Sequence, residues 1–149
     1  MKELHVSLGE QVQFSKTVSE SDVYLFAGIT GDFSVNHVNE KYMKGTIYGE
    51  RIAHGALLIG FMSTTSTMMI ERSVARGSDE TAVSLGYDRI RFLKPVFFGD
   101  TVTVTYTVEK IDSTSRRSWS KVEISNQHDE LVAVGQHLLK WTPNKPPDR

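Results

Sequence analysis

The sequence predicts an α+β domain made of one long apolar helix and a series of strands that follow it. From about His54 to Arg72 the chain carries apolar residues on nearly every side of a helix, and such a helix has to be surrounded by protein. Further along, Thr101–Val108 alternates threonine with valine or tyrosine, which is typical of a strand with one buried face. No helical pattern separates the later strands, so we expect antiparallel neighbours that curl around the helix.

The first third of the chain predicts a strand and two short helices. Gln11–Val18 alternates in the manner of a half-buried strand. Ser19–Asp22 matches a capping box, which predicts a helix over Val23–Ile29. A second short helix is expected over Asn39–Met43, with the asparagine as its cap and Gly45 at its end.

Turn residues divide the second half of the chain into strands. Gly99 and Asp100 mark one junction, and Gln127–Glu130 predicts a hairpin turn. Residues 142–149 are expected to form a flexible C-terminal tail, which leaves a single domain over residues 1–141. The four expected strands are Ala82–Phe92, Thr101–Ile111, Ser118–Ser125 and Leu131–Trp141.

Composition excludes several classes of function. The 149 residues carry a net charge of -1 and no long run of one sign, so nucleic acid and anionic membranes are not expected partners. The absence of cysteine excludes disulfides, a thiolate nucleophile and cysteine-ligated metal. No stretch has the ~20 apolar residues of a membrane span, and Met1–His5 leads into a polar stretch without a signal-peptide core. A soluble cytoplasmic protein is expected.

A carboxylate and an imidazole lie five residues apart at Asp32 and His37, and His54-Gly55 follows seventeen residues after the histidine. A carboxylate paired with an imidazole can hold a water between them and move protons at neutral pH. This spacing therefore favours an enzyme over a scaffold.

From Tyr24 to Ser63, and again after the long helix, the chain closely resembles the MaoC-like (R)-specific enoyl-CoA hydratase family of hotdog proteins. The resemblance implies a single hotdog domain, in which a long central helix is wrapped by a curved antiparallel sheet. The matching segments are Phe26-Ala27-Gly28-Ile29-Thr30-Gly31-Asp32-Phe33, His37-Val38-Asn39-Glu40, Arg51-Ile52-Ala53-His54-Gly55-Ala56-Leu57-Leu58 and Arg91–Val102.

The resemblance also implies a reaction, which is the reversible syn hydration of a trans-2-enoyl-CoA to an (R)-3-hydroxyacyl-CoA. Asp32 and His37 would be the catalytic pair, and the Gly55 amide would bind the thioester oxygen. A helix N-terminus suits that task, because its free N–H groups and positive dipole end face the developing negative charge. Ser63 occupies the position that orients the aspartate, and His54 is expected to support Gly55. No cofactor is expected beyond the coenzyme A of the substrate.

One departure from the family concerns the loop between the catalytic pair. Many members carry Asn-Pro where this chain has Ser34-Val35, so the loop lacks the backbone restriction of proline. Ser34 can still support a local turn by hydrogen bonding.

Substrate contacts outside the catalytic pair are expected from an aromatic residue and three cations. Phe33 is a candidate for an acyl tunnel, and Arg89, Arg91 and Lys94 are candidates for coenzyme A phosphates; core packing and a solvated strand face are the alternatives. No metal is expected, because the histidines lack the spacing of a zinc helix motif.

Two other functions are compatible with a hotdog fold. A thioesterase of this fold usually places a carboxylate on or near the central helix, whereas Ala56–Ile70 contains no Asp or Glu. A non-catalytic acyl-CoA-binding subunit is the other alternative. A homodimer or a multiple of dimers is expected in each case, because an exposed strand edge and an apolar groove would otherwise be open to solvent.

Overall fold

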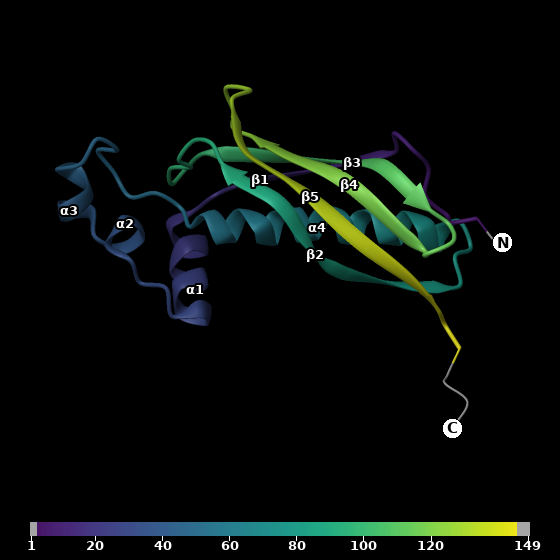
Figure 1. Ribbon diagram of the computed structural model, residues 1–149. Coiled ribbons are helices and arrows are strands. Elements are labelled where there is room, and N and C mark those ends of the chain that lie inside the picture. The colour runs from purple at the N-terminus through teal and green to yellow at the C-terminus, as the bar shows by residue number, and fades with distance from the viewer. Residues whose placement is uncertain (1–2, 146–149) are drawn as a thin grey trace.

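The computed structural model describes residues 3–145 and contains a five-stranded sheet and four helices (Figure 1). In chain order the elements are β1 (Gln11–Thr17), α1 (Glu20–Thr30), α2 (Val35–Val38), α3 (Glu40–Lys44), α4 (Gly55–Ala75), β2 (Glu80–Phe92), β3 (Thr101–Asp112), β4 (Arg117–Ser125) and β5 (Leu131–Pro143).

The sheet curves over one side of the long helix α4, as expected for a hotdog domain (Figure 1). Its strand order is β1-β3-β4-β5-β2, and every neighbouring pair is antiparallel. The predicted fold class is therefore confirmed. Strands β1 and β2 form the two edges, although they are separated in the chain by the three short helices and α4.

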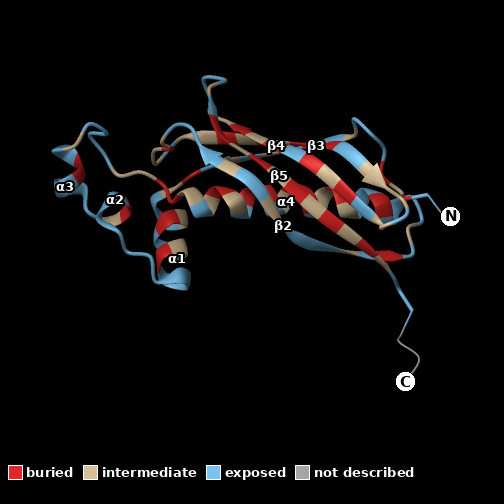
Figure 2. Cartoon of the chain, in the orientation of Figure 1, coloured by how far each residue is buried: buried red, intermediate tan, exposed pale blue. Residues whose placement is uncertain are grey.

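The alternation in β3 divides its residues between two faces as predicted. Val102, Val104, Tyr106 and Val108 are buried beneath the sheet, and Figure 2 shows buried residues alternating with partly buried or exposed ones along β3, β4 and β5. The intervening threonines face outward and hydrogen-bond β1 side chains, as at the 2.7 Å contact between the hydroxyls of Thr17 and Thr101. One face of the strand thus builds the core, and the other fastens the edge strand.

Helix α4 is covered on one side only. Leu58, Met62 and Met69 are buried against the sheet. The opposite side is exposed along Ala56, Gly60, Ser63 and Thr67, so the expectation of a helix enclosed on all sides is wrong for the single chain. The reason is that the residues on this outer face are small, whereas the large apolar side chains gather on the inner face.

The ends of several elements differ from their predicted positions. Helix α1 begins at Glu20 rather than Val23, and β2 begins at Glu80 rather than Ala82. Helix α4 continues three residues beyond Arg72, to Ala75. Strand β5 continues past Trp141 to Pro143, because Glu80 and Thr81 of β2 pair with its last two residues. The predicted tail thus begins within this strand, and residues 146–149 lie outside the described part of the chain.

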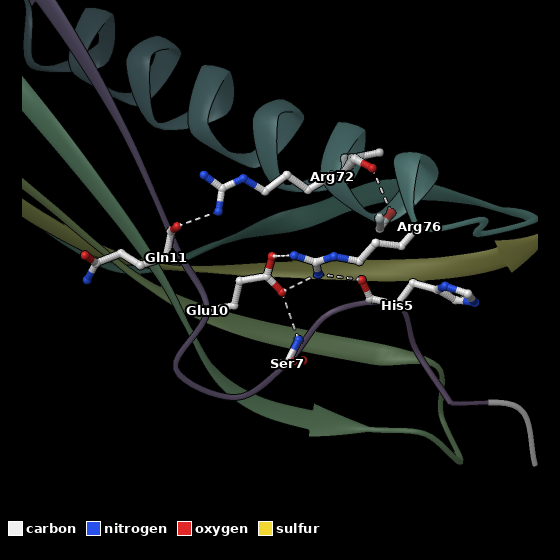
Figure 3. A network of polar contacts seen from close by, with 8 residues as sticks. His5, Ser7, Glu10, Gln11, Arg72 and Arg76 are labelled. Carbon is white, nitrogen blue, oxygen red and sulfur yellow. Dashed lines mark hydrogen bonds and ion pairs between the residues drawn. The ribbon is translucent and has the colours of Figure 1, made fainter.

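An arginine network fastens the N-terminal segment to the end of α4 (Figure 3). The guanidinium of Arg76 donates to both carboxylate oxygens of Glu10, at 2.7 and 2.8 Å, and to the carbonyl of His5. Arg72, one turn earlier, donates to the carbonyl of Gln11 at 2.9 Å. Because the Arg76–Glu10 pair is bidentate, it fixes orientation as well as distance.

No helix among residues 3–145 is long and apolar enough to span a membrane.

Candidate active site

The loop that carries Asp32 is shaped by the end of α1. Gly31 adopts a left-handed conformation with φ 81° and ends the helix, a position that glycine accepts without strain. The exposed Asp32 side chain then accepts a hydrogen bond from the backbone amide of Ser34 at 3.3 Å. Ser34 thus supports the loop through its amide, and its side chain makes no capping bond to α2.

His37 lies on α2 and is held by one backbone carbonyl. Its Nδ1 lies 2.7 Å from the carbonyl oxygen of Ile52. Because a carbonyl can only accept, Nδ1 must carry the hydrogen, and Nε2 of the neutral ring keeps its lone pair. Burial lowers the pKa of His37 below its ordinary value, and the nearby His54 lowers it further, while the bond to Ile52 and the charge of Asp32 act in the opposite direction. The geometry thus makes His37 Nε2 a base.

His54, the residue before α4, supports both members of the pair. Its Nε2 lies 2.9 Å from the backbone carbonyl of Asp32 and donates to it. Its ring stacks on that of His37, with centroids 3.7 Å apart and planes 28° apart, and Phe26 covers it at 4.7 Å. The side chain is 1% exposed, so a single buried ring connects the Asp32 loop to His37.

Asp32, His37 and His54 each bring one polar atom within 4.8 Å of the others. The stacking of the two rings limits what such a cluster can bind. An imidazole nitrogen directs its lone pair within the plane of its ring. The planes of His37 and His54 face each other with centroids 3.7 Å apart, so the two planes meet at a distance much greater than the ~2 Å of a zinc–nitrogen bond. The arrangement does not direct both lone pairs at one metal ion, whereas a water between Asp32 and His37 needs only one of the rings.

The first amide of α4 is free. Within the described chain the Gly55 N–H donates to no acceptor, and His54 makes no side-chain capping bond. This N–H lies at the positive end of a 21-residue helix. A Cβ at position 55 would lie 2.6–2.8 Å from three ring atoms of Phe92, so any side chain here would require this ring to move.

His37 and Gly55 open on one shared cavity of about 300 Å³. A residue with a basic nitrogen and a residue with a free amide therefore line the same mostly apolar space, which is typical of a ligand pocket. Its other lining residues are Tyr48, Ile52, Ala53, Leu58, Phe92, Leu93, Lys94, Pro95 and Val96.

Other predicted site residues lie away from this cavity. Ser63 is eight residues beyond Gly55, or about 12 Å along the helix axis, and is exposed beside Tyr87 of β2. In the described chain it makes no hydrogen bond to Asp32, whose carboxylate is bonded to the Ser34 amide. Phe33 is 59% exposed and does not line the cavity.

Of the three predicted cations, Lys94 alone borders the cavity. It forms an ion pair with Glu130 in the β4–β5 turn, and this contact with Lys94 is the main reason that the pKa of Glu130 is lowered. Arg89 and Arg91 lie on the irregular part of β2, where the register shifts between Asp88 and Arg91, and both are exposed outside the cavity.

Sequence reasoning missed the residues that close the cavity, chiefly Tyr48, Leu58 and Phe92. They come from a loop, a helix and the end of a strand, and no shared motif connects them. The one usable signal was the glycine at position 55, because a glycine at a helix start often marks the close approach of another group.

Comparison with protein families matches residues 4–132 to the model of the MaoC like domain. The chain therefore belongs to the MaoC-like domain family. The match begins before β1 and ends in β5, and so it includes the loop of Asp32, the start of α4 and the cavity.

Two curated relatives of this MaoC-like domain have named activities. An (R)-specific enoyl-CoA hydratase from Rhodospirillum rubrum is 43% identical over 100 residues, which cover 67% of this chain and 64% of the relative. The match thus spans less than two thirds of that relative's length. A 3-hydroxybutyryl-CoA dehydratase from Methylorubrum extorquens is 32% identical over 139 residues, which cover 93% of this chain and 82% of the relative.

A solved structure supports the fold of the MaoC-like domain independently. The (R)-hydratase from Aeromonas caviae involved in PHA biosynthesis superposes with a TM-score of 0.80 at 24% identity, covering 91% of this chain and 96% of that one. At this level of identity the comparison shows a shared fold.

Proposed function

We propose that this MaoC-like domain is a hydro-lyase that adds water reversibly and with syn geometry to a trans-2-enoyl-CoA, forming an (R)-3-hydroxyacyl-CoA. The observation that carries the proposal is the shared cavity, which is lined both by His37, whose Nε2 keeps its lone pair, and by Gly55, whose amide is free. The hydratase and dehydratase names of the two curated relatives support the same chemistry.

The proposed reaction uses one water and one proton. The Asp32 carboxylate and His37 Nε2 both accept hydrogen bonds, so a water between them is held by its two O–H groups. His37 Nε2 takes a proton as the water oxygen bonds to C3 of the substrate. The electron pair of the double bond then moves toward the thioester, whose oxygen becomes negative and is stabilised by the Gly55 N–H. The same proton passes to C2, which restores the carbonyl and the neutral imidazole.

The coenzyme A end of the substrate is proposed to reach Lys94. Lys94 lines the cavity, and its ion-pair partner Glu130 is on a turn rather than in the core. A substrate phosphate can therefore replace the carboxylate as its ion-pair partner. The outward positions of Arg89 and Arg91 favour Lys94 for this contact within the single chain.

The test is turnover of crotonyl-CoA, followed as loss of the absorbance of its conjugated double bond, with the chirality of the product determined by chromatography. Loss of the double bond with (R)-3-hydroxybutyryl-CoA as product is expected. Unchanged absorbance with crotonyl-CoA and with longer enoyl-CoAs would overturn the proposal. Release of free thiol from acyl-CoA would instead support a thioesterase, and tight acyl-CoA binding without turnover a non-catalytic subunit.

We also propose that the domain is a homodimer or a multiple of dimers. The exposed stripe of α4 formed by Ala56, Gly60, Ser63 and Thr67 is small and nearly uncharged, and β2 is a sheet edge with exposed Val83 and Leu85. A second copy of the chain would cover both features.

The dimer is tested with an arginine on the exposed face of α4. A Cβ at Gly60 meets no atom within 4 Å, and the same holds for Gly28 on α1, so the folded chain has room for either substitution. Light scattering is expected to give a dimer or larger for the natural protein and for Gly28→Arg, and a monomer for Gly60→Arg. A natural protein that scatters as a monomer would refute the arrangement.

A further inference from the structure

Phe92 is the last residue of β2, and its ring lies against the start of α4. The ring atoms Cδ2, Cε2 and Cζ lie 2.6–2.8 Å from the point where a side chain on residue 55 would begin. The side chain is nevertheless 51% exposed. One part of the ring therefore contacts the helix start, and the rest faces the cavity mouth and solvent.

We propose that Phe92 is a specificity-determining residue, whose ring excludes enoyl thioesters that carry a substituent on C2. The inference rests on the proposed hydratase function and adds to it the class of acyl group that the cavity accepts. Straight-chain 2-enoyl groups would fit beside the ring, and 2-methyl-branched groups would collide with it.

The argument begins from distances at residue 55. In a peptide the nitrogen lies roughly 2.5 Å from a Cβ on the same residue, so the ring atoms of Phe92 lie within about 5 Å of the Gly55 nitrogen. A thioester oxygen bound to that amide would lie about 2.9 Å from the nitrogen. The Phe92 ring and the thioester oxygen would thus both lie next to the Gly55 amide, at most about 8 Å apart.

The backbone that carries the ring is held by the neighbouring strand. Phe92 pairs with Ala133 in the sheet, and the next residue, Leu93, donates its amide to the carbonyl of Val132 at 2.8 Å. The Cα of Phe92 is therefore fixed by β5. His37 lines the same cavity, and its position is set by Ile52 and His54. A C2 substituent that avoids the Phe92 ring would have to displace the reacting atoms from His37.

The experiment compares kcat/KM for crotonyl-CoA and for 2-methylbut-2-enoyl-CoA in the natural protein, Phe92→Leu and Phe92→Ala. One methyl group in a tight pocket changes selectivity by about 10–200-fold. We expect the natural protein to prefer crotonyl-CoA by at least about tenfold. Phe92→Ala should lower this preference at least tenfold, chiefly by turning over the branched substrate faster, with Phe92→Leu intermediate.

Tyr42→Ala is the matched control, because Tyr42 is also an exposed aromatic, at 56%, and lies on α3 outside the cavity. Its preference should equal that of the natural protein. An unchanged preference in folded Phe92→Ala and Phe92→Leu would overturn the inference, as would equal turnover of both substrates by the natural protein. Failure of the natural protein to hydrate any enoyl-CoA would instead refute the proposed function on which the inference rests.

Discussion

The imidazole rings of His37 and His54 stack face to face at 3.7 Å, and each ring donates one N–H to a backbone carbonyl. The acceptors are the carbonyls of Ile52 and Asp32, so the two rings connect the loop before α4 with the loop after α1. The same two bonds fix both tautomers, which leaves His37 Nε2 as an acceptor. A backbone arrangement thus sets the acid–base character of the site.

Replacing His54 by phenylalanine tests this connection. His54→Phe keeps a stacked ring but removes the donor to the Asp32 carbonyl, and loss of one such bond should lower kcat about tenfold. Because the electrostatic interaction with His54 lowers the pKa of His37, the substitution should also move the acidic limb of the pH–rate profile to higher pH. His128→Phe, in the exposed β4–β5 turn, serves as the control. A pH–rate profile identical to that of the natural protein would show that His54 does not influence the catalytic residues.

Asp32→Asn should abolish most activity without unfolding the protein. The Asp32 side chain is exposed, and its recorded hydrogen bond is a local one to Ser34, so little stability depends on it. Loss of a carboxylate that holds the water should lower kcat by about 10²–10⁴-fold. Steady-state kinetics and thermal melting measure the two effects, and Asp129→Asn, at an exposed turn residue with φ 58°, provides the control. An active Asp32→Asn enzyme would remove Asp32 from the mechanism.

The buried His137 should make the fold sensitive to acid. It lies on β5 between the hydroxyls of Tyr106, 2.9 Å from Nδ1, and Ser84, 2.8 Å from Nε2, and Tyr87 stacks on its ring. Burial lowers the pKa of His137 from 6.5 to about 4. The unfolded chain therefore binds more protons below pH 6.5, and the free energy of unfolding should fall by about 3 kcal/mol as the pH drops from about 6.5 to about 4.

Denaturant titrations across this pH range measure the effect. His137→Gln keeps a donor and an acceptor but does not titrate, so its stability should depend less steeply on pH. His128→Gln, which changes an exposed histidine, should behave like the natural protein. An unchanged slope in His137→Gln would contradict the assignment.

A double-mutant cycle measures how tightly the Phe92 ring packs against Gly55. Gly55→Ala keeps the N–H but places a methyl group 2.6–2.8 Å from the Phe92 ring, which should cost about 1–3 kcal/mol of stability by overpacking and displace the ring. Phe92→Ala in the same chain removes the collision and should restore most of that stability. Thermal melting of the single and double variants measures these changes in stability. A Gly55→Ala protein as stable as the natural one would show that the Phe92 ring moves aside without cost.

Local sequence patterns predicted most of the fold because each of them is compatible with only one type of local structure. Both hydrogen bonds of the capping box are formed, because the Ser19 and Asp22 side chains each accept from the backbone amide of the other residue. The strict alternation of Thr101–Val108 required a strand with one buried face. Helix α2 escaped prediction because its four residues contain less than two turns and no periodic pattern. The open side of α4 escaped it because small residues are compatible with burial and exposure alike.

Only part of the site was accessible to sequence reasoning. Asp32, His37 and Gly55 lie in short motifs whose spacing limits their separation in space. The contact of Phe92 with Gly55 joins residues 37 positions apart, and it depends on where β2 ends relative to α4. The 12 Å between Gly55 and Ser63 follows from helix rise alone, but which neighbour meets Ser63 depends on tertiary packing.

The pairing of β1 with β3 has a consequence for biosynthesis. Gln11 is opposite Thr107, so the first strand of the domain leaves the ribosome long before the strand that completes its hydrogen bonds. At about 5–20 residues per second, the intervening chain takes roughly 5–20 s to make. Throughout that interval β1 has no strand to pair with, although in the folded protein its Val12 belongs to the core and its Phe14 packs against it. The nascent chain should therefore be most prone to aggregation, and most dependent on ribosome-bound chaperones, just before Thr101–Val108 emerges.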